Sequence, residues 1–105
     1  MQTKEIAGKQ VQVDEDGFLV NPNDWTREIA QALAAEQGID VLTEAHWRVI
    51  EFMRADFAEK GAVPTIRRLS KVGGIETKEL YELFPNGPAK KAARIAGLGK
   101  PQGCV

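Results

Sequence analysis

Residues 64–84 read PTIRRLSKVGGIETKELYELF, and this stretch decides the fold. Proline suits the first turn of a helix, so we expect a short helix over Pro64–Lys71. The Gly73-Gly74 pair permits a sharp reversal, because glycine adopts backbone angles that other residues avoid. A further helix follows over Thr77–Phe84, with three apolar residues on its inward face: Leu80, Leu83 and Phe84. Two short helices joined by a glycine turn predict a helix-turn-helix corner at the core of the domain.

Helical patterns continue on both sides of this corner. One helix is expected over Trp25–Gln37, with Asn23 or Asp24 as its N-cap. A longer helix is expected from Thr43 to Gly61, where Thr43 and His46 form only an imperfect capping box. Aromatic residues recur at helical spacing in this longer segment and are typical of a core face. After the Pro85-Asn86-Gly87 turn, Pro88 opens a last helix that runs to about Ala96.

The N-terminal residues alternate between polar and apolar side chains, which is typical of strands. Two short strands, Lys4–Ala7 and Gln10–Val13, are expected to form a β-hairpin around a Gly8-Lys9 turn. The sequence therefore predicts a mainly α fold: a small orthogonal helical bundle of about five helices with an N-terminal β-hairpin and a helix-turn-helix-like core.

The chain of 105 residues has the length and composition of one folded domain, with 43% hydrophobic and 28% charged residues. We expect residues 1–97 to form the helical domain. Three of the last eight residues are glycine or proline and show no periodicity. Residues 98–105 are therefore expected to form a flexible C-terminal arm.

Location and redox environment follow from what the sequence lacks. No apolar run approaches the roughly 20 residues that a membrane span needs, and the N-terminus lacks the apolar stretch of a signal peptide. The chain has one cysteine, whereas small secreted domains usually carry an even set. We therefore expect a cytoplasmic protein that does not associate with a membrane.

Charge is unevenly distributed along the chain. Residues 1–60 hold 6 Lys and Arg against 12 Asp and Glu, and residues 61–105 hold 8 against 3. This segregation indicates that the C-terminal half meets an acidic protein or a nucleic acid, although such charges also commonly just face solvent. The basic residues expected to dock a partner are Arg67, Arg68, Lys71, Lys90, Lys91, Arg94 and Lys100.

Cys104 is the most informative single residue. Free cysteines are usually buried and inert, but this one lies next to the last residue, beside Gly103, where little could bury it. A thiol at a flexible end can reach into the active site of another protein. Such a thiolate could attack a sulfane sulfur, hold it as a persulfide and pass it on by exchange at sulfur. Lys100 would favour the thiolate and the terminal carboxylate would oppose it, so we expect activation only on docking.

The helix-turn-helix corner also suggests a second function class, a DNA-binding regulator whose second helix enters the major groove. The pattern is weakly specific, since many helical domains use the same corner only for packing. The second helix carries Glu76, Glu79 and Glu82 against Lys78 alone, and these carboxylates would repel phosphates. Direct nucleic-acid binding is therefore the alternative rather than the main hypothesis.

Self-contained catalysis and metal binding have no motif to support them. His46 is the only histidine, and no zinc-ligand spacing, phosphate-binding glycine loop or nucleophile motif occurs. We expect a surface or helix N-terminal role for His46, and neither a metal nor a cofactor.

One stretch and the C-terminus together resemble a known family. The segment from Leu83 to Lys90, LFPNGPAK, followed by IAGL at Ile95–Leu98 and KPQGCV at Lys100–Val105, is similar to the C-terminal signature of the DsrC/TusE sulfur-relay family. Earlier blocks resemble the family as well: DEDGFL from Asp14, TEAHW from Thr43 and PTIRRLSK from Pro64. The resemblance implies a helical domain with a mobile arm, and Cys104 as its reactive thiol. It implies a sulfurtransferase-type persulfide carrier rather than a self-contained enzyme.

The cysteine count bears on the subtype. In the family that this chain resembles, DsrC proper carries a second cysteine in its arm, at the position of Ala93. This chain has a single cysteine and is therefore similar to TusE. That implies donors of the Tus or DsrEFH type, and a tRNA 2-thiouridylase or a sulfite-reductase-type enzyme as acceptor. The short Val72–Ile75 connection is instead similar to that of the sulfite-reductase-associated members. Gly99, where a proline is typical, should loosen the arm.

Overall fold

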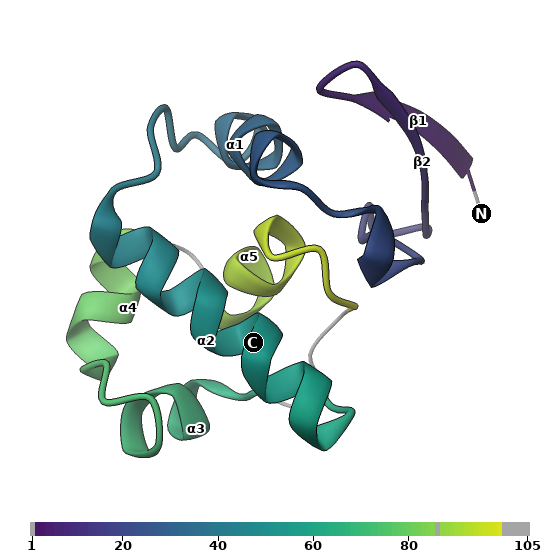
Figure 1. The fold of residues 1–105 in the computed structure, drawn as a ribbon. Helices are drawn as coiled ribbons and strands as arrows, with labels where there is room; N and C mark the ends of the chain where they lie inside the picture. The colour runs from purple at the N-terminus through teal and green to yellow at the C-terminus, as the bar shows by residue number, and fades with distance from the viewer. Residues whose placement is uncertain (1, 86, 100–105) are drawn as a thin grey trace.

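The computed structural model describes residues 2–85 and 87–99, which form a β-hairpin followed by five α-helices (Figure 1). These elements are β1 Gln2–Ile6, β2 Lys9–Val13, α1 Arg27–Glu36, α2 Glu44–Lys60, α3 Ile66–Lys71, α4 Thr77–Leu83 and α5 Pro88–Ile95. A short 3₁₀ turn, Pro22–Asp24, precedes α1. The predicted fold class, mainly helical with an N-terminal hairpin, is confirmed.

The hairpin turns one residue earlier than predicted. Strands β1 and β2 are antiparallel with Gln2 opposite Val13 and Ile6 opposite Lys9, so the turn residues are Ala7 and Gly8. Both have positive φ, 53° and 80°, as two-residue hairpin turns that follow the twist of the strands require. Buried Ile6, Val11 and Val13 share the face that turns toward the helices.

Helix α1 begins later than predicted, because Thr26 is its N-cap rather than Asn23 or Asp24. The Thr26 hydroxyl accepts a hydrogen bond from the Ile29 amide, 3.1 Å away. Asn21 caps the 3₁₀ turn that contains Asn23 and Asp24. Trp25 lies between the 3₁₀ turn and the N-cap of α1. Its extended backbone separates the turn from the helix.

Helix α2 has a complete capping box, where only an imperfect one was predicted. Nδ1 of His46 accepts from the Thr43 amide at 3.1 Å, and the Thr43 hydroxyl accepts in return from the His46 amide. Glutamate or glutamine usually occupies this position, and the imidazole serves the same purpose here. The helix ends at Gly61, as predicted.

The helix-turn-helix corner consists of α3 and α4 with residues 72–76 between them. Thr65 caps α3, so Pro64 lies before the N-cap and not in the first turn as predicted. Helix α4 follows from Thr77 with Glu76 at its N-cap position. Leu69, Ile75 and Leu80 are buried at the corner and attach it to the remaining core.

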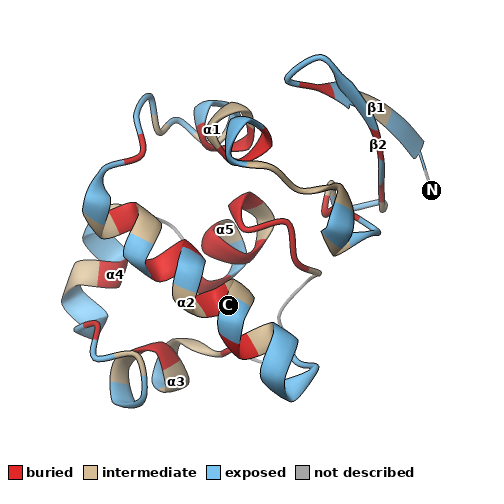
Figure 2. Ribbon diagram, in the orientation of Figure 1, coloured by how far each residue is buried: buried red, intermediate tan, exposed pale blue. Residues whose placement is uncertain are grey.

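Helix α5 lies at the centre of the helical domain. It contacts α1, α2 and α4 (Figure 1). Ala89, Ala92, Ala93 and Ile95 are fully buried, and the small alanines allow the neighbouring helices to approach closely. Burial continues past the end of α5 (Figure 2) and includes Leu98, of which only 1% is exposed. The buried core of the described residues therefore extends three positions beyond the last residue of α5.

Candidate functional site at the C-terminal end of α5

The candidate thiol Cys104 and the candidate docking residue Lys100 lie outside the described residues. The structure does describe the stretch from which that segment departs, residues 95–99. The Leu98 amide donates to the Ala93 carbonyl at 2.9 Å, and the Gly97 amide donates to Arg94 at 3.2 Å. Leu98, which the sequence assigned to the arm, is thus packed and hydrogen-bonded as part of the core. The division of the chain into a domain and a flexible arm stays a prediction.

Two side chains from earlier in the chain bind the carbonyls of the last residue and of the C-cap residue of α5. The indole Nε1–H of Trp25 donates to the Ile95 carbonyl at 2.8 Å. The Arg54 guanidinium donates to the Ala96 carbonyl at 2.7 Å and to the Pro22 carbonyl at 3.2 Å. It also lies over the Trp25 ring, 4.1 Å from the ring centroid, in a cation–π contact. We call Trp25 and Arg54 the clamp.

Neither clamp residue was predicted as functional from the sequence. Trp25 was predicted as the first residue of a helix, and Arg54 lies mid-helix among other charged residues of α2. Burial lowers the pKa of Arg54, but a guanidinium still stays charged at neutral pH. The partners lie 70 and 42 residues along the chain, so no local sequence signal could have linked them to α5.

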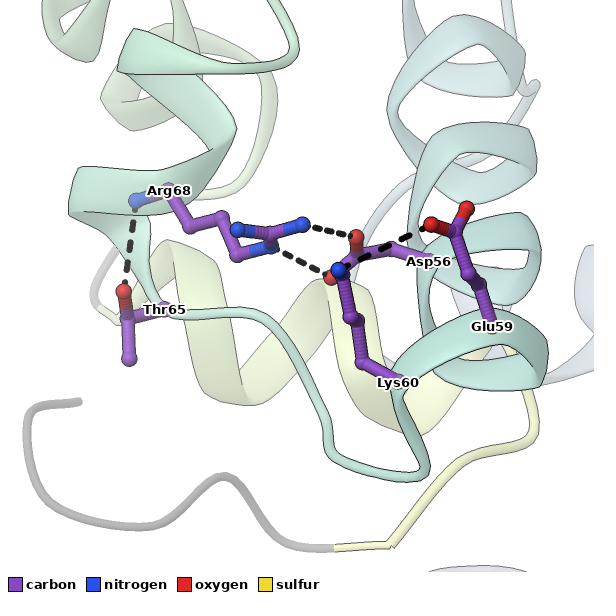
Figure 3. A network of polar contacts seen from close by, with 5 residues as sticks. All are labelled: Asp56, Glu59, Lys60, Thr65 and Arg68. Atoms are coloured by element: carbon purple, nitrogen blue, oxygen red, sulfur yellow. Dashed lines mark hydrogen bonds and ion pairs between the residues drawn. The ribbon is translucent and has the colours of Figure 1, made fainter.

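The basic residues predicted to dock a partner are not equivalent. Arg68 crosses from α3 to α2 and forms a bidentate ion pair with Asp56, with Nε–Oδ2 at 2.8 Å and Nη2–Oδ1 at 2.6 Å (Figure 3). The hydrogen bond from Arg68 lowers the pKa of the Asp56 carboxyl and raises that of the guanidinium. Arg68 therefore stabilises the α2–α3 junction and has little capacity left for a partner.

Arg94 is also largely engaged within the fold. Its guanidinium lies against Gly17, where an added Cβ would overlap with it. Its Nε is buried and has no hydrogen-bond partner among the described residues. Lys90 and Lys91 lie on α5, where Lys90 is exposed and Lys91 is half-buried.

Arg67 and Lys71 are the two predicted docking residues that the structure brings together on an open surface. Both are exposed on α3 and line a hollow of about 530 Å³. The remaining lining residues are small or apolar: Thr65, Ile66, Ser70 and Thr77. A mostly apolar depression with two cations at its rim could accept an acidic, partly apolar segment of a partner protein.

The outer surface of α4 has the opposite charge. Glu76, Glu79 and Glu82 line a second hollow together with Lys78. Three carboxylates against one ammonium make this helix poorly suited to the phosphates of DNA. His46 is buried, with 8% exposed, and contributes to the α2 capping box rather than to a reactive site.

Within residues 2–85 and 87–99, no group of three or more His, Cys, Asp or Glu side chains could hold a metal ion. The helices of the same residues include none that is both long and apolar enough to span a membrane.

Residues 5–105 match the family model described as "DsrC like protein". The chain belongs to the DsrC-like family. This DsrC-like chain is 44% identical over 98 residues to the "Sulfite reductase, dissimilatory-type subunit gamma" of Nitratidesulfovibrio vulgaris, covering 93% of each chain. It is 43% identical over 108 residues to "Sulfurtransferase TusE" of Yersinia pseudotuberculosis, covering 96% and 99%.

Solved structures agree with the comparison of sequences. The NMR structure of Allochromatium vinosum DsrC superposes with a TM-score of 0.80 at 44% identity, covering 98% of the DsrC-like chain and 97% of that chain. The predicted resemblance to the DsrC/TusE family is therefore confirmed. The printed names of these matched proteins do not refer to DNA binding, so the alternative function gains no support from them.

Proposed function

We propose that this chain is a sulfur carrier that accepts sulfur as a persulfide on Cys104 and passes it to a second protein. Its relatives include a sulfurtransferase and a sulfite reductase subunit, and both names refer to sulfur chemistry. The observation that carries the proposal is where the buried core ends relative to the single cysteine. Leu98 is the last residue of the described part that is buried, and Cys104 follows six positions later.

That separation gives the thiol considerable reach. An extended chain spans at most about 3.3–3.6 Å per residue, so Cys104 could extend roughly 20 Å from Leu98. This length suits a thiol that must enter the active sites of two other proteins. A carrier of this kind needs no catalytic pocket of its own.

The transfer is a pair of thiol–disulfide exchange steps. The Cys104 thiolate attacks the outer sulfur of a donor persulfide; a new S–S bond forms, the donor's S–S bond breaks, and the donor leaves as a thiolate. An acceptor nucleophile then attacks the outer sulfur on Cys104 and releases the Cys104 thiolate. Sulfur moves at each step without a net gain or loss of electrons by the carrier, so no cofactor is required.

The proposal includes a surface that docks the donor and acceptor proteins. Arg67 and Lys71 border the hollow on α3 and would bind acidic side chains of a donor or acceptor. Lys90, Lys91 and Lys100 are further candidates, whereas Arg68 is paired with Asp56 and Arg94 packs against Gly17. The proposed donors are proteins of the Tus or DsrEFH type.

The acceptor is a tRNA 2-thiouridylase or a sulfite-reductase-type enzyme. The resemblance implies a second cysteine of DsrC proper at the position of Ala93, and this chain has one cysteine, so a mechanism that needs only one thiol fits it. To distinguish the two acceptors, the persulfide-loaded protein is incubated with each enzyme separately. The true acceptor should remove the extra sulfur from the protein.

The deciding experiment is intact mass spectrometry after incubation with cysteine and a cysteine desulfurase, or with another persulfide donor. Wild type should gain one sulfur atom that a reductant removes, and Cys104→Ser should gain none. The absence of any gain with donors that load a known carrier would overturn the proposal.

A further inference from the structure

Four successive carbonyls at the C-terminal end of α5, from Ala93 to the C-cap residue Ala96, have hydrogen-bond partners. The last four carbonyls of an α-helix have no partner within the helix and are commonly left to solvent. Here the Ala93 and Arg94 carbonyls accept from the amides of Leu98 and Gly97. The next two, Ile95 and Ala96, accept from the clamp residues Trp25 and Arg54.

The clamp joins three separate parts of the chain at one point. Arg54 on α2 connects the Ala96 carbonyl with the Pro22 carbonyl, which belongs to the 3₁₀ turn before α1. The Arg54 charge also lies at the negative end of the α5 dipole, where a cation is favourable. Gly97 packs so closely on the Trp25 ring that a Cβ there would overlap with it.

We propose that Trp25 and Arg54 are positioning residues for the carrier thiol. They fix the end of the buried core at Leu98, which sets the point from which the stretch that carries Cys104 begins. This positioning role rests on the proposed sulfur-carrier function. Whether the clamp holds the end of α5 in place can be tested without any sulfur chemistry.

Loss of the clamp would lengthen the stretch between the fixed core and Cys104. If the last turn of α5 opens, the stretch between the fixed core and Cys104 lengthens from six residues, counting Cys104, to about ten, because Leu98 loses its bond to Ala93. The effective concentration of a tethered group falls roughly as the −3/2 power of tether length, which gives about a twofold decrease. The fixed direction of departure is lost as well, so the expected slowing of transfer between docked proteins is larger than this factor.

The structural test measures amide hydrogen exchange at Leu98 in Trp25→Phe and Arg54→Met. Trp25→Phe removes the hydrogen bond to the Ile95 carbonyl, and Arg54→Met removes those to the Ala96 and Pro22 carbonyls. Exchange at Leu98 should become about tenfold faster, the factor expected for the loss of one ordinary hydrogen bond from a local opening equilibrium. Arg54→Lys is a second variant, which keeps the charge but cannot bridge two carbonyls as the guanidinium does.

The chain contains a matched control pair. Arg27 lies over the Trp47 ring at 4.0 Å, the same stacked arrangement, but neither residue bonds to the Ile95 or Ala96 carbonyl among the described contacts. Arg27→Met and Trp47→Phe should leave exchange at Leu98 unchanged. If the clamp variants match these controls, the proposal is wrong.

The functional test compares two reactions of Cys104 in the same variants. A small aromatic disulfide reaches the thiol wherever the segment begins, so its rate should stay within about twofold of wild type. Loading from a protein persulfide donor should slow at least threefold, because it depends on the docked position of the thiol. Faster exchange at Leu98 with unchanged loading would overturn the positioning role. Failure of wild type to accept sulfur would refute the carrier function, and Leu98 exchange would still decide the clamp.

Discussion

Nε2 of His46 lies 3.1 Å from the carbonyl oxygen of Leu83, so one imidazole connects the first turn of α2 with the last residue of α4. A carbonyl can only accept, so Nε2 carries the proton and Nδ1 is free to accept from Thr43. The ring edge also contacts Phe84, with 5.2 Å between the centroids. His46 thereby fixes α2 against α4 immediately before the turn that leads into α5.

Substitution of His46 should separate these two contributions. His46→Ala loses both the cap and the bond to Leu83, so the free energy of unfolding should fall by about 2 kcal/mol. Glutamine is a usual partner in a capping box but would not reach Leu83, so His46→Gln should lose about half as much. Urea denaturation measures both changes. Equal losses in the two variants would show that the capping box contributes nothing.

The Asp56–Arg68 ion pair predicts a specific dependence of stability on pH. The pKa of Asp56 is lowered in the folded protein, chiefly by the hydrogen bond from Arg68. Its stabilising contribution is therefore present above the pKa of the unfolded chain and is lost as pH falls through the folded pKa. Between pH 7 and pH 3, Tm should decrease less steeply in Asp56→Asn than in wild type.

Glu82→Gln is the control for this titration, because Glu82 is an exposed carboxylate on α4. It should follow the wild-type slope. A wild-type slope in Asp56→Asn as well would mean that the ion pair does not set the acid stability of the protein.

Three glycines allow backbone strain and steric overlap to be measured separately. Gly97 and Gly61 both have φ of +74°, but only at Gly97 would a Cβ meet the Trp25 ring. Gly61→Ala should cost about 1 kcal/mol for the left-handed conformation alone. Gly97→Ala should cost clearly more, and Gly99→Ala, which has neither problem, should cost almost nothing. Equal losses at Gly97 and Gly61 would contradict the tight packing on Trp25.

The burial of Ala93 predicts how a second thiol would behave. Ala93 is fully buried in α5, so the thiol of Ala93→Cys should be protected from small disulfide reagents in the folded protein. In the Ala93→Cys, Cys104→Ser double variant, we expect almost no reaction in buffer and one thiol per chain in denaturant. Ready reaction in buffer would mean that α5 opens far more often than its packing indicates.

Most of the fold could be predicted from local signals in the sequence. The Thr43 cap and Gly61 at the two ends of α2, and Pro88 at the start of α5, lie where the pattern placed them. The start of α1 was wrong because several residues before it could serve as a cap. Trp25 has an extended backbone and binds Ile95, and that contact is not visible in local sequence.

The candidate site was predictable in chemistry but not in geometry. Cys104 stands out by its position alone, whereas Arg68 was grouped with free surface cations. Only the structure shows that Arg68 faces Asp56, twelve residues earlier on another helix. The clamp was missed for the same reason, because its hydrogen bonds end on backbone atoms that carry no sequence signature.

The hydrogen bonds of the clamp end on backbone atoms, which affects how the sequences of such proteins can diverge. Trp25 and Arg54 bind carbonyl oxygens, which every amino acid has, so substitutions in the last turn of α5 need not disturb the clamp. A cysteine could replace Ala93, or be lost from that position, while the C-terminal segment still departs after Leu98. One scaffold could thus gain or lose a buried second thiol by a single substitution.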